Sequence, residues 1–301
     1  MGEFNVVVWK VEHGSAAFVR TPNGRTLAFD AGASSEFSPA KHLSASYGLD
    51  SYSNRLDYLF VSHPHSDHLT DLPTVYESLR PKVLSRNKSC PDDKVYKDGT
   101  DNLSEPFKTW KKMNDEYIHP VSGYEALTPD SNWEGVHFST YCIEPEQLSD
   151  AGKGEGHLLN NLSLCVLVRY RDVEVFFPGD LEPAGWDALI DNTSVLDDVG
   201  GSDKSLRVLV ASHHGRASGI RNTDRTVYTR FLDAMKPHLV LISDKYGNDT
   251  TDPDAYRPHA LGAKVYCKAT ESLEDKKVVT TKTNDYVRVN HDTTAPLVIM
   301  P

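Results

Sequence analysis

Three histidines and an aspartate lie within six positions of the segment VSHPHSDHLTDL, residues 61–72: His63, His65, Asp67 and His68. Side chains two positions apart on a strand point the same way, so His63 and His65 can reach one ion. Asp67 and His68 follow at a predicted turn into a helix and can reach a second point nearby. Nitrogen and carboxylate groups are ligands that Zn²⁺ takes at about 2 Å. Surface or internally bonded histidines are the alternative, but so many polar groups would each need another partner. The spacing therefore predicts a metal site.

The elements around this cluster can be read from hydrophobic patterning. Strand-like segments cover residues 5–11, 16–21 and 25–32, and the turn signal PNGR separates the last two. The apolar segment 56–63 predicts a strand that ends on His63. Beyond the cluster, the spacing of Leu72, Val75, Tyr76 and Leu79 predicts a helix, with Pro73 in its first turn.

Strands and helices alternate in the second half of the chain. We expect strands at 135–143, 206–215 and 238–244, a buried hairpin at 161–180, and helices at 182–190 and near 228–235. A C-terminal hairpin over 277–290 would turn at Asn284-Asp285. Residues 85–133 are polar and weakly periodic, which predicts a variable insertion or long loops, with at most one short helix. This order predicts an α/β protein, a four-layer αββα sandwich formed by one domain over residues 1–301.

Composition narrows the functional classes. The formal net charge is −11, whereas a protein that grips nucleic acid through its overall field would be basic. There is no apolar stretch long enough to span a membrane and no signal peptide at the N-terminus. The four cysteines show no CxxC spacing, which favours reduced thiols in a cytoplasmic protein.

Several segments resemble motifs of the metallo-β-lactamase-fold superfamily. SHPHSDH matches its H-x-H-x-D-H motif, LAFDAG resembles its first motif, and FFPGD resembles a later one. The resemblance implies that Asp30 sits behind the metals and that Asp180 bridges two of them. A finer resemblance links the chain to the soluble domain of ComEC-type competence proteins and their free-standing relatives. It is carried by VEHGSAAFVRTPNGRTLAFDAG, NNLSLCVLV, FFPGDLE, VASHHG and LDAMKPHLVLIS.

Two departures from the superfamily pattern concern the metal ligands. Hydrolytic relatives have a third histidine where this chain has Asn160 and Asn161, as the ComEC-type branch tends to have. An amide oxygen is a weak ligand for transition metals, so we expect Asn161 to contact substrate instead. His157 is a minor alternative ligand.

The last superfamily histidine is replaced by Ser243-Asp244. His213 and His214, at the end of a predicted strand, are the available substitutes, although a tight turn with one structural histidine is the alternative. His259 is a further candidate, on a loop that would close over the site.

The resemblance implies a hydrolase that uses two divalent ions, Zn²⁺ before Mn²⁺, with the first ion weakly held. The expected metal ligands are His63, His65, Asp67, His68, Asp180 and His214. Asp67 would orient the attacking water or accept its proton, and His213 or His214 would protonate the leaving oxygen. No G-x-S-x-G, P-loop or G-x-G-x-x-G motif supplies a competing chemistry.

The same resemblance implies phosphodiester cleavage, with DNA or a small nucleotide as partner. Three basic clusters give partial support: Arg80 to Lys88, Lys108 to Lys112 around Trp110, and Arg216, Arg221 and Arg225. Arg216 is the basic residue expected to contact substrate. Ordinary solvated surface is the alternative for the first two clusters. Two other functions stay open: a lactone or thioester hydrolase, and a non-catalytic metal-containing nucleic-acid-binding protein.

Overall fold

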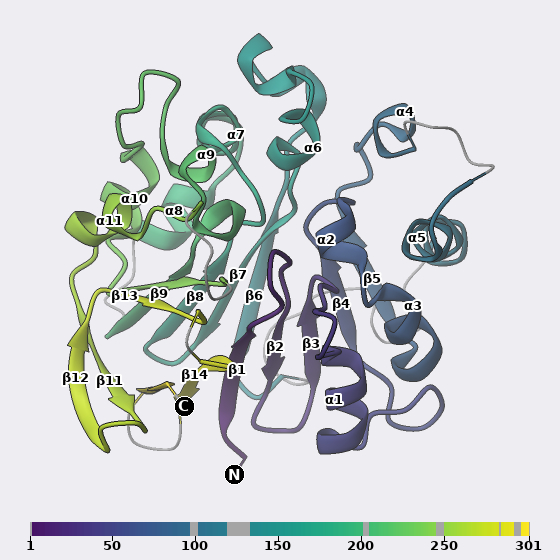
Figure 1. The fold of residues 1–301 in the computed structure, drawn as a ribbon, viewed down its shortest axis with the longest axis horizontal. Coiled ribbons are helices and arrows are strands. Elements are labelled where there is room, and N and C mark those ends of the chain that lie inside the picture. The colour runs from purple at the N-terminus through teal and green to yellow at the C-terminus, as the bar shows by residue number, and fades with distance from the viewer. Residues whose placement is uncertain are drawn as a thin grey trace.

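Two β-sheets pack face to face, and each carries helices on its outer face (Figure 1). The computed structural model describes residues 2–96, 102–118, 133–200, 205–244, 250–282, 284–291 and 296–300. One hydrophobic cluster fills the space between the sheets. A second lies between the six-stranded sheet and its helices, and a third lies between the nine-stranded sheet and its helices. The predicted four-layer αββα sandwich is therefore confirmed. The predicted organisation as one domain stays a prediction.

The larger sheet has nine strands, and two of them, adjacent and near one end of the sheet, lead to the histidine cluster. β3(Thr26–Phe29) and β4(Tyr58–Val61) are parallel neighbours, so Asp30 and Ser62 leave the sheet at the same edge. β1(Phe4–Trp9) pairs antiparallel with β2, which pairs antiparallel with β3. The strand order is β12(Ser272–Lys276), β11(Ala263–Cys267), β15(Pro296–Met300), β14(Tyr286–His291), β1, β2(Ala17–Arg20), β3, β4 and β5(Val83–Arg86).

The smaller sheet contributes a second set of strand ends to the same site. Its order is β13(Val278–Thr280), β10(Leu239–Ile242), β9(Leu206–Val210), β8(Val173–Phe177), β7(Cys165–Tyr170) and β6(Val136–Tyr141). β8, β9 and β10 are parallel to one another. Because the carboxyl ends of parallel strands meet at one edge, the segments after β8 and β9 bring Asp180 and His214 together.

Helices cover both outer faces. The nine-stranded sheet is covered by α1(Pro39–Tyr47), α2(Ser66–Leu69), α3(Leu72–Thr74) with the π-helical turn η1(Val75–Leu79), and α5(Glu105–Glu116). The six-stranded sheet is covered by α7(Pro183–Asn192), α8(Val195–Gly200) and α10(Arg230–Met235). Shorter elements complete the described chain: α4(Asp92–Val95), α6(Leu158–Asn161), α9(Ala217–Ile220), α11(Pro253–Tyr256), and the 3₁₀ turns η2(Pro145–Gln147), η3(Asp150–Lys153), η4(Ser212–Gly215) and η5(Arg257–His259).

Several local predictions are confirmed and two are wrong. Pro73 lies in the first turn of α3, and β7 pairs with β8 as the predicted buried hairpin. The predicted hairpin over 277–290 does not form, because β13 pairs with β10 in one sheet while β14 pairs with β1 in the other. Thr281 helps to hold β13 there, since its hydroxyl accepts from Asp244 N at 2.9 Å. The predicted insertion at 85–133 lies partly outside the described residues, and its described part contains two helices, α4 and the twelve-residue α5, where at most one short helix was expected.

Membrane-spanning helices and disulfides are absent from the described residues. No helix in the described ranges has the length and apolar character that a membrane crossing requires. All four cysteines fall within those ranges, and none forms a disulfide. Burial raises the pKa of the Cys90 thiol to about 12, so this thiol stays protonated near neutral pH.

Candidate metal centre

His63 leaves the end of β4 and is buried at the base of the cluster. Its Nδ1 lies 3.1 Å from Ser62 Oγ and 3.3 Å from Ser163 Oγ. Its Nε2 faces the other way, 2.8 Å from His65 Nδ1 and 3.8 Å from Asp180 Oδ2. The two hydroxyls therefore fix the ring so that Nε2 points at the other polar side chains. His63 and His65 do converge, but both lie in the loop between β4 and α2 and not on the strand from which their direction was predicted.

His68 lies on α2 and is fully buried. Its Nδ1 is 2.9 Å from Asp30 Oδ2, and its Nε2 is 3.3 Å from Asp180 Oδ1 and 3.2 Å from His214 Nε2. Asp30 also accepts from Ser62 N at 2.7 Å and adopts a left-handed conformation with φ 58°. A carboxylate behind a histidine in this way fixes the ring orientation and its proton. Asp30 thus lies behind the cluster, where the motif comparison put it.

Asp180 lies at the centre of the cluster, on the turn after β8. Its backbone N–H donates to Ser163 Oγ at 3.0 Å. The preceding Gly179 has φ 62°, and a Cβ there would lie 2.7 Å from Ser163 Oγ and 2.7 Å from Ser62 Cβ. Only glycine fits this turn without displacing the two serines, because both the positive φ and the close approach exclude a side chain.

His214 completes the cluster from the six-stranded sheet. Its Nε2 lies 3.4 Å from Asp67 Oδ2 and 3.4 Å from Asp180 Oδ2. Both His213 and His214 have positive φ, 49° and 54°, in the turn η4. This conformation is uncommon outside glycine and indicates a turn that the surrounding structure holds in place.

His213 lies beside the cluster and is more open than His214. Its Nε2 is 3.7 Å from Asp180 Oδ2, while its Nδ1 is 3.4 Å from Glu182 Oε1 and 3.0 Å from Ser218 Oγ. The side chain is 14% exposed, against 6% for His214. The two adjacent histidines therefore take different places: His214 among the buried donors, and His213 on their open side.

The donor atoms form two overlapping groups. His63, His68 and Asp180 make one group, and Asp67, His68 and His214 make the other, with the ligand atoms of each group within 4.8 Å of one another. The facing Nε2 atoms of His68 and His214 cannot both present a lone pair without a proton or cation between them. Imidazoles and carboxylates suit Zn²⁺ and related ions. The residues present therefore fit the metal that the motif implies.

The buried histidines and carboxylates of the cluster shift one another's pKa values. Burial, followed by the positive charge of His68, holds the pKa of His63 well below its usual range. Burial opposes protonation of His68 and His214, but nearby carboxylates outweigh it. Asp180 and Asp30 raise the pKa of His68 well above its usual range, and Asp180 raises that of His214 to about 9. Burial also opposes ionisation of Asp180, yet His214 and His68 hold its pKa well below its usual range.

The predicted substrate residues lie outside the donor groups. Asn161 is buried, where its Nδ2 donates to Gly152 O at 3.1 Å and its Oδ1 accepts from Glu182 N at 3.0 Å. His259 lies on η5, with Nδ1 3.7 Å from Asp233 Oδ1. Arg216 follows η4 and is half-buried. Their roles in substrate binding stay predictions.

The sequence reasoning missed Glu182, which links several of these residues. One carboxylate oxygen lies 3.4 Å from His213 Nδ1 and accepts from Asn160 Nδ2 at 3.2 Å, while the other is bonded to His157 Nδ1. The His157 ring therefore binds Glu182 through Nδ1 and is not a member of either donor group. The only sequence signal was the position of Glu182 two residues after Asp180 in GDLE.

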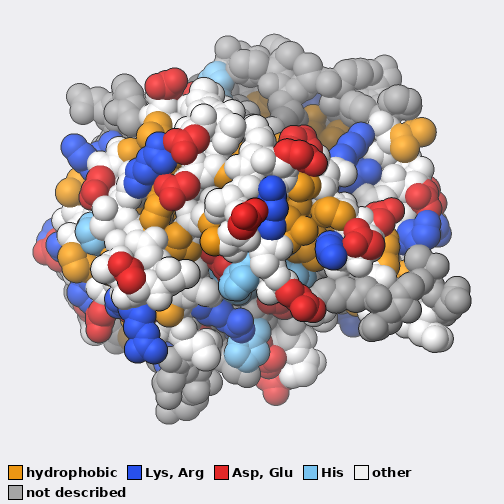
Figure 2. Space-filling model, turned by 90° about the horizontal axis from the view of Figure 1, so that it is seen from above, with side chains coloured by type: hydrophobic (Ala, Val, Ile, Leu, Met, Phe, Trp, Pro, Cys, Tyr) orange, Lys and Arg blue, Asp and Glu red, His pale blue; other side chains and the backbone are white. Residues whose placement is uncertain are grey.

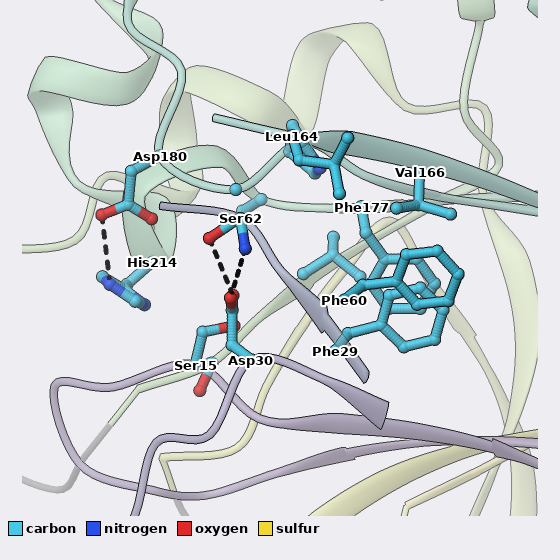
Figure 3. Close-up of a pocket in the computed structure, with 15 residues that line it drawn as sticks. Ser15, Phe29, Asp30, Phe60, Ser62, Leu164, Val166, Phe177, Asp180 and His214 are labelled. Atoms are coloured by element: carbon cyan, nitrogen blue, oxygen red, sulfur yellow. Dashed lines mark hydrogen bonds and ion pairs between the residues drawn. The ribbon is translucent and has the colours of Figure 1, made fainter. Parts of the chain in front are cut away.

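The cluster lies between a small internal pocket and an open cleft. Figure 3 shows Asp180, His214, Asp30 and Ser62 at one end of the pocket, whose other end is lined by Phe29, Phe60, Phe177, Leu164 and Val166. From above, histidine side chains gather near the middle of the visible face, with acidic side chains beside them (Figure 2). A cleft of about 390 Å³ opens at His65 and is also lined by Lys94, Lys153, Gly154 and Gly156.

Two of the three predicted basic clusters have other partners. Arg86 donates to the backbone carbonyls of Asn114 and Tyr117, and Lys82 lies 2.8 Å from Asp57. On α5, the three lysines each pair with an acidic residue of the same helix: Lys108 with Glu105, Lys111 with Asp115 and Lys112 with Glu116. These contacts favour the interpretation as ordinary surface for both clusters. In the third cluster, Arg221 pairs with Asp252.

Comparisons with known proteins complete the description. No family model and no curated protein matches the chain. The chain is similar to several solved structures. One is the diiron β-hydroxylase CmlA from Streptomyces venezuelae, at 16% identity and a TM-score of 0.43, and the match covers 81% of this chain and 45% of CmlA. The chain thus spans less than half of that protein. A proposed metal-dependent hydrolase from Parabacteroides distasonis is 13% identical with a TM-score of 0.41, covering 92% of this chain and 93% of the other. The Rm3 metallo-β-lactamase is 13% identical with a TM-score of 0.38, covering 70% and 76%.

Proposed function

We propose that this protein is a two-metal hydrolase of the metallo-β-lactamase fold that cleaves phosphodiester bonds. The observation that carries the proposal is the position of Asp180. Its carboxylate lies 3.8 Å from His63, 3.3 Å from His68 and 3.4 Å from His214, so it can bridge the two donor groups. Two bound ions would supply a water of lowered pKa and Lewis-acid stabilisation of the reacting oxygens.

The remaining chemistry falls to Asp67 and His213. The Asp67 side chain is 35% exposed, whereas His68 and His214 in the same donor group are buried. Asp67 is therefore the member of this group that is open to solvent. It can accept the proton of an attacking water. His213 faces the cluster with Nε2 and is held from behind by Glu182 and Ser218. It can donate a proton to the leaving oxygen, a role that suits imidazole near neutral pH.

The cleft at His65 offers two cations to an anionic substrate, and two carboxylates line it as well. Lys94 and Lys153 lie beside Asp93 and Glu155, and Lys94 Nζ is 3.3 Å from Asp93 Oδ2. The cleft volume of about 390 Å³ suits a short or single-stranded segment or a small nucleotide. The net charge of −11 disfavours strong nonspecific binding to duplex DNA.

The finer family relation belongs to the same proposal. A soluble ComEC-type relative would act on DNA, and a cytoplasmic location fits that activity. The main alternative is a lactone or thioester hydrolase. Leu158 and Leu159 also line the cleft and could hold an apolar acyl group. The position of Asp180 between the two donor groups supports the phosphodiester instead.

The test compares substrates and variants after loading with Zn²⁺ or Mn²⁺. We expect cleavage of bis(p-nitrophenyl) phosphate and of a labelled single-stranded decamer, and a roughly 100-fold or larger loss in Asp67→Asn. Asp115→Asn is the matched control, since it removes one carboxylate from the exposed face of α5. Cleavage of a lactone but of neither phosphodiester would replace the proposal with the alternative. No cleavage with any divalent metal, with equal DNA binding by wild type and Asp67→Asn, would leave a binding protein.

A further inference from the structure

A second cleft, of about 520 Å³, lies on the outer side of the nine-stranded sheet, away from His65 and its lysines. Its walls come from β1, β14, α1 and the loop 31–38. The residues that matter are Trp9, Phe37, His42, Tyr47, Tyr286 and Arg288. The volume falls within the range of roughly 300–1,000 Å³ that small-molecule sites occupy.

Aromatic rings form one wall of this cleft. The Trp9 ring centroid lies 6.1 Å from Phe37 and 6.0 Å from His42, and His42 lies 6.5 Å from Tyr47. Trp9 is buried, whereas Phe37, His42 and Tyr47 are each half-buried and keep part of their surface open. Burial and then the charge of Arg288 lower the pKa of His42, so its ring stays neutral at neutral pH. Neutral, partly open rings are suited to stacking against a planar ligand.

Arg288 supplies a cation to the same cleft. Its guanidinium lies 5.3 Å from the centroid of the Tyr286 ring. Its Nε is buried and has no hydrogen-bond partner within the described ranges of the chain. The residue as a whole is half-buried and lines the cleft, so its guanidinium is a cation that an anion in the cleft can contact. Lys10 lines the cleft as a second cation, while the lining carboxylates of Glu36 and Asp285 belong to exposed residues.

We propose that this cleft binds a nucleotide, with the base against the Phe37, His42 and Tyr47 rings and the phosphate at Arg288 and Lys10. A planar ring joined to a phosphate matches the two features that the cleft presents together. The nucleotide could be free or the end of a single strand, because both present the same base and phosphate. The proposal stands on these lining residues alone, and does not require that the metal centre cleave phosphodiesters.

The chain connects this cleft to the metal centre. The loop 31–38 starts directly after Asp30, which holds His68, and ends at α1 beside the cleft. Trp9 is also tied to the edge of the smaller sheet, since its carbonyl accepts from Ser243 Oγ at 3.2 Å. A nucleic-acid strand bound in the second cleft would therefore lie at the same edge of the nine-stranded sheet as the histidine cluster.

The experiment measures binding of 2′-deoxyadenosine 5′-monophosphate to metal-stripped protein in EDTA by calorimetry. Deoxyadenosine and deoxyribose 5-phosphate test the base and the phosphate separately, and a deoxythymidine decamer tests the strand. Arg288→Gln and Tyr286→Leu are the test variants. Arg171→Gln is the matched control, because Arg171 makes a similar contact with Tyr170 at 5.2 Å on another part of the molecule.

We expect the nucleotide to bind more tightly than either fragment, with at least a tenfold loss in Arg288→Gln and no change in Arg171→Gln. Much tighter binding of the decamer than of the nucleotide would identify a strand, and equal binding would identify a free nucleotide. Equal affinity of wild type and both test variants would overturn the proposal, and so would a fragment that binds as well as the nucleotide. If Arg288→Gln does not fold, Tyr286→Leu decides. Binding without any phosphodiesterase activity would uphold this site and reject the proposed function.

Discussion

Replacing Asp30 by Asn should weaken metal binding without removing any metal ligand. Asp30 Oδ1 accepts from Ser62 N at 2.7 Å, and Oδ2 accepts from Ser62 Oγ at 3.0 Å and lies 2.9 Å from His68 Nδ1. Asn tolerates the left-handed backbone that Asp30 adopts with φ 58°, so the turn itself should survive. An amide, however, has one acceptor oxygen and one NH₂ group where the carboxylate has two acceptors.

The size of the effect follows from this geometry. If the amide oxygen stays on Ser62 N, its NH₂ group faces His68 Nδ1. That nitrogen must then accept, so the ring proton moves to Nε2, the atom that faces Asp180 and His214. If the amide flips, its NH₂ group faces the Ser62 N–H instead. Either mismatch costs roughly 1–3 kcal/mol, and loss of such a supporting carboxylate typically lowers metal affinity about 10- to 100-fold.

The assay is a competition titration of Zn²⁺ against a chromogenic chelator, with thermal unfolding measured in parallel. Asp57→Asn is the matched control, since Asp57 is buried at the other end of β4 and binds Thr26 N at 2.9 Å and Lys82 at 2.8 Å. Both variants should lose stability, but only Asp30→Asn should lose metal affinity. Equal Zn²⁺ affinity in the two variants would refute the assigned role of Asp30.

Three further outcomes are expected. Glu182→Gln should lower kcat about 100-fold with little change in KM, because His213 Nδ1 loses its carboxylate partner at 3.4 Å. A loss of kcat in Glu182→Ala with none in Glu182→Gln would contradict this role of the carboxylate. Gly179→Ala should lower the free energy of unfolding by roughly 2–5 kcal/mol in a urea titration, because its Cβ would meet Ser163 Oγ at 2.7 Å at a positive φ. Metal binding at pH 7.5 should release protons, since the pKa of His214 is raised to about 9 and that of His68 is also raised, whereas a ligand must be neutral. The share that comes from His214 should fall as the pH rises through its pKa, and calorimetric heats that are equal in buffers of different ionisation enthalpy would refute the prediction.

The sequence predicted the parts of the site that depend on local spacing. His63, His65, Asp67 and His68 converge because a strand end and the following short helix fix their directions. Parallel pairing of strands then brings in residues from distant segments at the same edge. The wrong hairpin at 277–290 shows the limit, because the alternating apolar pattern of a strand does not say which sheet it joins.

Residues that act through tertiary contacts left no such pattern. Glu182 was missed because its importance comes from His213, His157 and Asn160, which only the fold brings to it. The second cleft was missed for the same reason, since Trp9 and Arg288 come from opposite ends of the chain and meet only when β1 pairs with β14. Side chains of these types are common on any surface, so their spacing carried no signal.

The two donor groups differ in how many ligands they offer to an ion, and this difference bears on where a substrate would bind. Asp67, His68 and His214 form one group that Asp180 completes, and both His68 and His214 are buried within it. The other group, His63, His68 and Asp180, draws two of its members from this first set, and Asn161, turned to the Glu182 backbone, adds no ligand to it. An ion there would be the more weakly held. His65, whose Nδ1 lies 2.8 Å from His63 Nε2, also lines the cleft, so a substrate there would lie beside the group that would hold its ion more weakly.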